Sequence, residues 1–130
     1  MKPKPTVLFI DDDQVTRKIY SASLAMSGIP ALFTSSPEEA VTILEEKRVD
    51  VIVTDLMMPK YNGVDLIEAV RAADYTKHIP ILVFTSGGNM ELMEQAALAG
   101  ANEIVQKHST PPAKLVEKIL KAHEDAPERK

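Results

Sequence analysis

Short apolar runs alternate with segments of helical periodicity along the chain, and this alternation constrains the fold more than any other feature. The runs contain mostly branched or aromatic residues, as expected of strands buried on both faces. They lie at Val7–Ile10, Ala31–Phe33, Val51–Val53, Ile81–Phe84 and Ile104–Val105. Strand and helix alternating at this spacing predict an α/β fold with a doubly wound, five-stranded parallel sheet that helices cover on both sides.

Between these runs, apolar residues recur at helical spacing and predict five helices. The stripes are Val15, Ile19, Ala22 and Met26; Ala40, Ile43 and Leu44; Ile67 and Val70; Met90, Met93 and Ala97; and Leu115, Ile119 and Leu120. Ser36 and Pro37 have the character of an N-cap and a first helical position, and Glu39 is placed to close a capping box. Gly28 and Gly100 mark helix ends.

Length and composition limit the possible functions. At 130 residues the chain fits one domain, 1–130, with a core over about 6–123 and a frayed charged tail over 124–130. A net charge of −4 offers no basic surface for nucleic acid, and no apolar stretch has the length of a membrane span. The sequence has no cysteine, which excludes thiolate chemistry and fits a cytoplasmic location.

Carboxylates follow two of the predicted strands. Asp11 and Asp12 come directly after the first run, and Asp55 follows the third. The carboxyl ends of parallel strands open onto one edge of the sheet, so these side chains should converge there. Adjacent carboxylates repel one another unless a cation lies between them, and an all-oxygen set of ligands suits Mg²⁺. Asp13 is better interpreted as a residue of a solvated helix N-terminus.

Two further strand ends carry residues that can bind phosphate. Thr85 and Lys107 supply a hydroxyl and an ammonium group, which a phosphoryl group on Asp55 would require. Pro59 and the pair Asn62-Gly63 predict an ordered turn that fixes Asp55 at the mouth of the site.

These motifs together resemble the receiver domain family of response regulators, in which a protein accepts a phosphoryl group in two-component signalling. The resemblance spans about residues 6–123, and it implies a flavodoxin-like sheet of order 2-1-3-4-5 with five helices. The matching stretches are Val7–Asp12, Asp55–Pro59 with Asn62-Gly63, Phe84–Ser86, and Gly100–Asn102 leading to Lys107.

The resemblance also implies roles for individual residues. Asp55 would be the phosphoacceptor, taking its phosphoryl group from a histidine kinase or a histidine phosphotransfer protein. Asp12, Asp55 and the main-chain carbonyl of Met57 would ligate Mg²⁺ directly, and Asp11 would act through water. The chain would not be an enzyme with an external substrate, because it would catalyse only its own phosphorylation and dephosphorylation.

The phosphoryl group would be read by neighbouring residues. Thr85, Ser86 and Lys107 would contact its oxygens, and the inward movement of Thr85 would change the surface formed by the fourth helix, fifth strand and fifth helix, where a downstream partner binds. The fourth helix also carries more apolar residues than one buried stripe needs.

Two positions depart from the family pattern. His108 follows Lys107, where the family usually has proline, so we expect a trans peptide bond and an altered loop. Ile104 stands where the family commonly has an aromatic residue, so the usual aromatic switch is missing.

Two other hypotheses remain open. The run Asp11-Asp12-Asp13 also matches the nucleophile motif of haloacid-dehalogenase-like phosphatases, with Asp11 as nucleophile and the aspartate two residues later, Asp13, as acid and base. However, no further acidic metal-binding motif follows Lys107. The second alternative is a non-switching pseudo-receiver that serves as a docking module.

Overall fold

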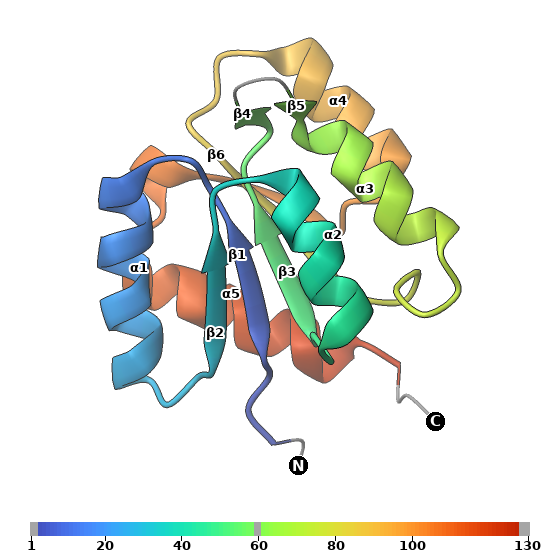
Figure 1. Ribbon diagram of the computed structural model, residues 1–130. Coiled ribbons are helices and arrows are strands. Elements are labelled where there is room, and N and C mark those ends of the chain that lie inside the picture. The colour runs from blue at the N-terminus through green and yellow to red at the C-terminus, as the bar shows by residue number, and fades with distance from the viewer. Residues whose placement is uncertain (1–2, 59–60, 128–130) are drawn as a thin grey trace.

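The computed structural model describes residues 3–58 and 61–127, and a parallel sheet lies at its centre (Figure 1). Its strands are β1 (Val7–Ile10), β2 (Ala31–Thr34), β3 (Val51–Thr54), β6 (Ile81–Thr85) and β7 (Glu103–Gln106). They lie in the order β2-β1-β3-β6-β7, and all neighbouring pairs are parallel. Counted among these strands alone, the order is 2-1-3-4-5, which confirms the predicted flavodoxin-like sheet.

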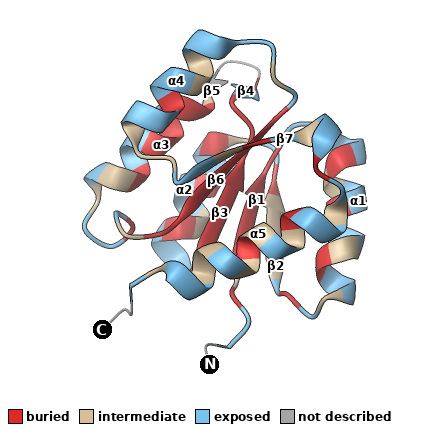
Figure 2. Ribbon diagram, turned by 180° about the vertical axis from the view of Figure 1, so that it is seen from behind, coloured by how far each residue is buried: buried red, intermediate tan, exposed pale blue. Residues whose placement is uncertain are grey.

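Helices cover both faces of the sheet (Figures 1 and 2). They are α1 (Gln14–Met26), α2 (Pro37–Glu46), α3 (Gly63–Ala72), α4 (Met90–Ala99) and α5 (Pro112–Asp125). Side chains alternate along β1: Val7 and Phe9 pack under α1 and α5, whereas Leu8 and Ile10 pack under the other helices. Among the described residues, no helix combines the length and hydrophobicity needed to cross a membrane.

Helix α1 packs with a different face from the predicted one. Its buried residues are Thr16, Tyr20 and Leu24. The Tyr20 ring lies 5.0 Å from the Phe84 ring between centroids, and its hydroxyl donates to the Thr110 carbonyl at 3.3 Å. These contacts set the rotation of the helix, so the predicted stripe faces solvent instead of the core. The exposed residues are Val15, Ile19, Ala22 and Met26.

The predicted helix ends are confirmed at some positions and corrected at others. Ser36 is the N-cap of α2 and accepts the Glu39 amide at 3.1 Å, but the capping box is not closed, because the Ser36 amide donates to Thr34 Oγ1 at 3.2 Å. Gly100 ends α4 with a positive φ of 119°. The predicted tail begins too early, because α5 continues to Asp125.

A short antiparallel hairpin between β3 and α3 was not predicted. It consists of β4 (Met57–Met58) and β5 (Tyr61–Asn62). Asn62 is then the N-cap of α3, accepting the Asp65 amide at 3.1 Å. Pro59 and Lys60, which belong to the predicted turn, lie outside the described residues.

Candidate phosphoacceptor and metal site

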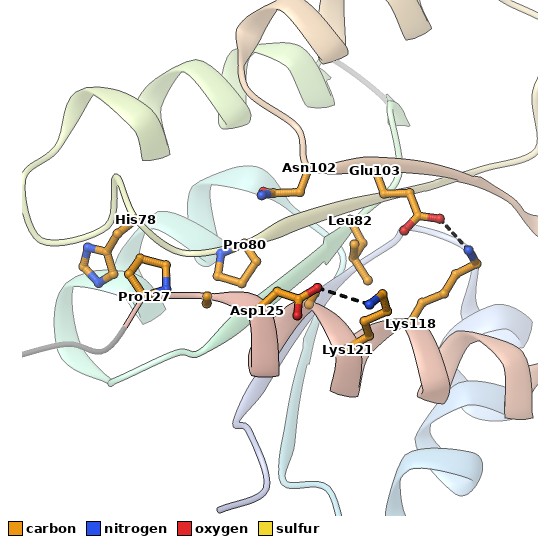
Figure 3. Close-up of a pocket in the computed structure, with 11 residues that line it drawn as sticks. His78, Pro80, Leu82, Asn102, Glu103, Lys118, Lys121, Asp125 and Pro127 are labelled. Carbon is orange, nitrogen blue, oxygen red and sulfur yellow. Dashed lines mark hydrogen bonds and ion pairs between the residues drawn. The ribbon is translucent and has the colours of Figure 1, made fainter. Parts of the chain in front are cut away.

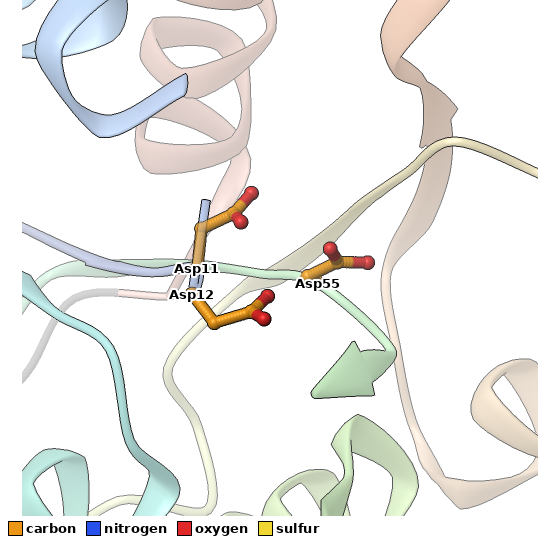
Figure 4. A group of neighbouring side chains, drawn as sticks. All are labelled: Asp11, Asp12 and Asp55. Carbon is orange, nitrogen blue, oxygen red and sulfur yellow. The ribbon is translucent and has the colours of Figure 1, made fainter. Parts of the chain in front are cut away.

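Three carboxylates meet at the carboxyl edge of the sheet, as the sequence predicts (Figure 4). Asp11 and Asp12 follow β1, and Asp55 follows the adjacent strand β3. One carboxylate oxygen from each residue lies within 4.8 Å of the others. Asp11 and Asp55 are buried and Asp12 is exposed, so the cluster is open to solvent on the Asp12 side.

Lys107 faces two of these carboxylates from the end of β7. Its Nζ lies 2.7 Å from Asp11 Oδ2 and 3.0 Å from Asp55 Oδ2. It also lies 5.8 Å from the centroid of the Phe84 ring. One ammonium group faces a cluster of three carboxylates, so the ionised cluster keeps an excess of negative charge.

Local main-chain contacts hold Asp55 in place. Its Oδ1 accepts the amide of Leu56 at 2.7 Å, which leaves Oδ2 directed at Lys107. Gly63 lies against the same loop, and a Cβ there would come within 2.4 Å of the Asp55 carbonyl oxygen. Glycine is therefore required at position 63 because the Asp55 carbonyl lies too close for a Cβ. The predicted Asn-Gly turn does not imply this requirement.

The first turn of α1 positions the acidic run. Asp13 is the N-cap: its Oδ1 accepts the Val15 amide at 3.0 Å, and its Oδ2 accepts the Thr16 hydroxyl at 2.8 Å. This confirms the interpretation of Asp13 as a helix-terminus residue. Arg17 Nη1 donates to the Asp11 carbonyl at 2.5 Å, a contact that sequence reasoning missed. The only indication of this contact in the sequence is a basic residue about one helical turn after the acidic run.

The remaining predicted residues lie at the same edge. Thr85 is the last residue of β6 and is buried, and Ser86 follows it and is exposed. The Met57 side chain is exposed, while its main chain follows the Asp55 loop. Thus a predicted site residue ends β6, and others directly follow β1, β3 and β7.

Burial and charge act in opposite directions on the ionisable groups. Burial raises the pKa of the Asp11 carboxyl above its ordinary value, against hydrogen bonds from Lys107 and the Asp13 amide. Burial alone would lower the pKa of Lys107, but its hydrogen bonds and attraction to Asp11 and Asp55 outweigh that effect and raise it. Lys107 therefore keeps its charge at neutral pH, whereas burial disfavours the ionised form of Asp11.

The donor set fits a small divalent cation. Asp11 Oδ2 is buried and lies 2.7 Å from the Lys107 ammonium. Carboxylate oxygens from three residues on an open face suit Mg²⁺, which keeps several water ligands.

The two departures from the family pattern lie beside this site. Ile104 is half-buried in β7 and packs against the core beneath α4. His108 is exposed in η1 (Lys107–Ser109), a short 3₁₀ turn. No cis peptide bond occurs among the described residues, in agreement with the expected trans bond after Lys107.

A pocket of about 410 Å³ lies at the opposite, amino edge of β6 and β7 (Figure 3). Two ion pairs line it, Lys118 with Glu103 and Lys121 with Asp125. Each of these lysines has a carboxylate partner, so the pocket has no excess of charge comparable to that of the aspartate cluster.

Comparison with known proteins identifies the family. A model described as the response regulator receiver domain matches residues 7–120. The chain belongs to this family. It is 36% identical over 123 residues to the chemotaxis protein CheY of Pseudomonas aeruginosa, covering 91% of this chain and 95% of that protein. Its relatives therefore place this receiver domain with the chemotaxis type.

Solved structures of other receivers share the fold. CheY4 of Vibrio cholerae superimposes with a TM-score of 0.83 at 27% identity, over 92% of this chain and 99% of that chain. The receiver domain of the sensor histidine kinase PA1611 from Pseudomonas aeruginosa has a TM-score of 0.85 at 22% identity, covering 95% of this chain and 100% of that chain. That structure has a magnesium ion coordinated in its active site cleft.

Proposed function

We propose that this receiver accepts a phosphoryl group on Asp55, in a Mg²⁺-dependent reaction, from a phosphohistidine on a histidine kinase or a histidine phosphotransfer protein. One observation carries the proposal: a buried carboxylate, 3.0 Å from a lysine ammonium, within a cluster of three acids at the ends of adjacent strands. Membership of the receiver family supports the same reaction class.

The chain's own groups divide the work of the transfer. A carboxylate oxygen of Asp55 forms a bond to phosphorus as the phosphorus–nitrogen bond breaks, and the electron pair of that bond leaves with the imidazole. The main-chain amide of Leu56 orients the Asp55 carboxylate. Lys107 balances charge on the phosphoryl oxygens, and Thr85 and Ser86 supply hydroxyl donors at the same edge. Such transfers depend mainly on positioning and charge neutralisation.

Asp11, Asp12, Asp55 and the main-chain carbonyl of Met57 would hold the Mg²⁺ ion. The ion supplies positive charge that lets a phosphoryl group approach a cluster of carboxylates. The magnesium-bound receiver of PA1611 supports this assignment, as does the cluster of carboxylate oxygens from Asp11, Asp12 and Asp55.

The change in affinity for a downstream protein would begin at the same residues. A phosphoryl group on Asp55 draws Thr85 and Lys107 toward it, and both lie at the ends of strands beside α4 and α5. The surface of α4, β7 and α5 would then change its affinity for a downstream protein. Ile104 lies in β7 within this region and is half-buried, so the change would be transmitted by an aliphatic side chain instead of a ring.

Intact-mass spectrometry after incubation with a small phosphodonor and Mg²⁺ tests the proposal. We expect a labile phosphoryl adduct on the wild-type chain that is absent in Asp55→Asn and absent when EDTA removes the cation. No adduct under any condition would instead favour the pseudo-receiver docking module.

The same assay separates the phosphatase hypothesis. A phosphatase would turn over the phosphodonor continuously and would lose activity in Asp11→Asn while keeping it in Asp55→Asn. The structure argues against this outcome, because both carboxylate oxygens of Asp13, the acid and base in that motif, are engaged at the N-terminus of α1.

A further inference from the structure

Lys107 lies on a turn that its own sequence does not hold rigid. It begins η1, and His108 follows it, so no proline ring fixes φ at that position. The hydrogen bonds that close the turn are long: 3.4 Å from the Thr110 amide to the Lys107 carbonyl, and 3.4 Å from the Ser109 hydroxyl to the Gln106 carbonyl. Short 3₁₀ turns have poor hydrogen-bond geometry. The position of the Lys107 ammonium must therefore depend on contacts from outside the turn.

Tyr20 of helix α1 provides such a contact. Its hydroxyl donates to the Thr110 carbonyl at 3.3 Å, across a separation of 90 residues in the sequence, and both residues are buried. Thr110 directly follows η1 and precedes Pro111, which restricts the Thr110 backbone to extended conformations. Its φ of −129° and ψ of 93° agree with that restriction. The end of the turn is thus anchored to α1 at the residue that follows it.

The Tyr20 ring reaches Lys107 by a second route, through Phe84. The rings of Tyr20 and Phe84 meet edge to face, with 5.0 Å between centroids and 79° between planes. Lys107 Nζ lies 5.8 Å from the centroid of the same Phe84 ring. Phe84 is 1% exposed, so its ring cannot turn away without losing core packing. Aromatic contacts therefore couple the position of the ammonium group to Tyr20.

The Tyr20 hydroxyl keeps its proton and can serve as the donor in this arrangement. Burial raises the pKa of the Tyr20 phenol above its ordinary value, and the nearby charge of Lys107 acts in the opposite direction. The phenol is therefore neutral at physiological pH, and its O–H group is held by the Thr110 carbonyl.

We propose that Tyr20 is a positioning residue for phosphoryl transfer, because it holds the Thr110 carbonyl and the Phe84 ring and thereby fixes the Lys107 ammonium against Asp55. This role rests on the proposed function and adds a residue of α1 to it. Tyr20 is not part of the aspartate cluster and acts through Lys107. A displaced ammonium group stabilises the charge of the phosphoryl oxygens less well, so a loss of positioning lowers the rate of transfer.

The test compares Tyr20→Phe with Thr76→Val as its matched control. The Thr76 hydroxyl donates to the Val70 carbonyl at 2.8 Å near the end of α3, and Thr76 is buried outside the aspartate cluster. Each substitution removes one buried hydroxyl, keeps the shape of the side chain and deprives one carbonyl of its donor. Both variants should remain folded and lose a similar amount of stability, about 4 °C in Tm. The pair therefore separates a loss of stability from a loss of positioning.

The first readout is the kinetics of adduct formation with a small phosphodonor and saturating Mg²⁺. In Tyr20→Phe we expect the maximal rate to fall about tenfold, while the half-saturating phosphodonor concentration stays within about twofold of the wild-type value. Thr76→Val should keep the wild-type rate. Lys107→Met removes the group that Tyr20 positions, so adding Tyr20→Phe to that variant should lower its rate by less than about twofold.

The second readout does not require phosphorylation. With ¹⁵N in the lysine side chains, NMR in EDTA follows the exchange of the Lys107 ammonium protons with water, which the contacts to Asp11 and Asp55 slow. Tyr20→Phe should speed this exchange about fivefold, because the turn opens more often. Thr76→Val should leave it within about twofold of the wild-type value.

The two readouts distinguish this role from the proposed function. If the wild-type chain forms no adduct but Tyr20→Phe still speeds exchange of the ammonium protons, the phosphoacceptor function fails and the hold of Tyr20 on Lys107 stands. Unchanged exchange in Tyr20→Phe would overturn the role of Tyr20, whether or not adduct forms. So would an adduct-forming chain in which Tyr20→Phe has the rate of Thr76→Val, or in which Tyr20→Phe slows transfer equally with and without Lys107.

Discussion

The two edges of β6 and β7 both carry lysine–carboxylate pairs, yet they differ in burial and in balance of charge. At the carboxyl edge, one lysine faces the buried Asp11 and Asp55, with Asp12 beside them. At the amino edge, Lys118 and Lys121 each pair with one partly or fully exposed carboxylate. Burying a cluster with an excess of one charge costs free energy of folding. Proteins retain such clusters where a ligand supplies the opposite charge. The comparison therefore supports the carboxyl edge as the location of the proposed function.

The strongest test of this comparison is to remove the Lys107 ammonium group at the carboxyl edge. Lys107→Met leaves the buried Asp11 and Asp55 without their counter-charge, so we expect a loss of about 4 kcal/mol in the free energy of unfolding without Mg²⁺. Urea denaturation followed by circular dichroism in EDTA measures the loss. Added Mg²⁺ should recover part of it, because the ion binds the folded state. A loss below about 1 kcal/mol would mean that burial does not distinguish the two edges.

The second largest effect concerns the loop that places Asp55. In Gly63→Ala the new Cβ meets the Asp55 carbonyl oxygen at 2.4 Å, so the loop must shift, at about 3 kcal/mol. Adduct formation in the mass assay should fall in parallel, because Asp55, the proposed phosphoacceptor, moves. Gly87→Ala is the control: φ is +87° there but no atom lies within 4 Å of the new Cβ, so about 1 kcal/mol of backbone strain is expected. Equal losses in the two variants would contradict the close-approach argument.

Much of the fold and the site was predictable because both depend on local patterns. Apolar runs of two to four residues identified all the strands of the parallel sheet, and strand ends are where a parallel sheet gathers polar side chains. Asp11, Asp55 and Lys107 were therefore expected to converge, and they do.

Features decided by tertiary contacts were not predictable. The apolar stripe of α1 has the correct helical period, but ring packing of Tyr20 on Phe84 turned another face inward. Gly63 was identified from a turn motif. Its role is instead to let its backbone approach the loop that follows Asp55, which the turn motif does not predict. The capping box of Ser36 was not closed because the Thr34 hydroxyl competed for the same amide.

A smaller effect, of opposite sign, is expected from neutralising Asp11. The pKa of the Asp11 carboxyl in the folded state is raised above the unfolded value of 3.8. The protonated carboxyl therefore favours the folded state below that pH, and this contribution to the free energy of unfolding is lost as the pH rises through the folded-state pKa. Asp11→Asn keeps an acceptor for the Asp13 amide without the charge. It should raise stability by about 1 kcal/mol at pH 7 without Mg²⁺, and by nothing below about pH 4.

Denaturant midpoints across this pH range measure the difference, and Asp12→Asn is the matched control. Asp12 is exposed, so its neutralisation should give a change of a few tenths of a kcal/mol at most. If Asp11→Asn destabilised the chain at neutral pH, the Lys107 pair would outweigh the burial of the Asp11 charge, and the excess charge at this edge would be compensated within the protein.

The smallest effect is expected at the amino edge, and it tests the other half of the comparison. Lys118→Met removes the partner of Glu103, but that carboxylate is 45% exposed and water can solvate it, so the loss should be below about 1 kcal/mol. Adduct formation on Asp55 should be unchanged. Glu103 begins β7, and Lys107 directly follows the end of that strand. A fall in adduct formation in Lys118→Met would therefore mean that β7 transmits changes between its ends, and the two edges would have to be treated as one coupled unit.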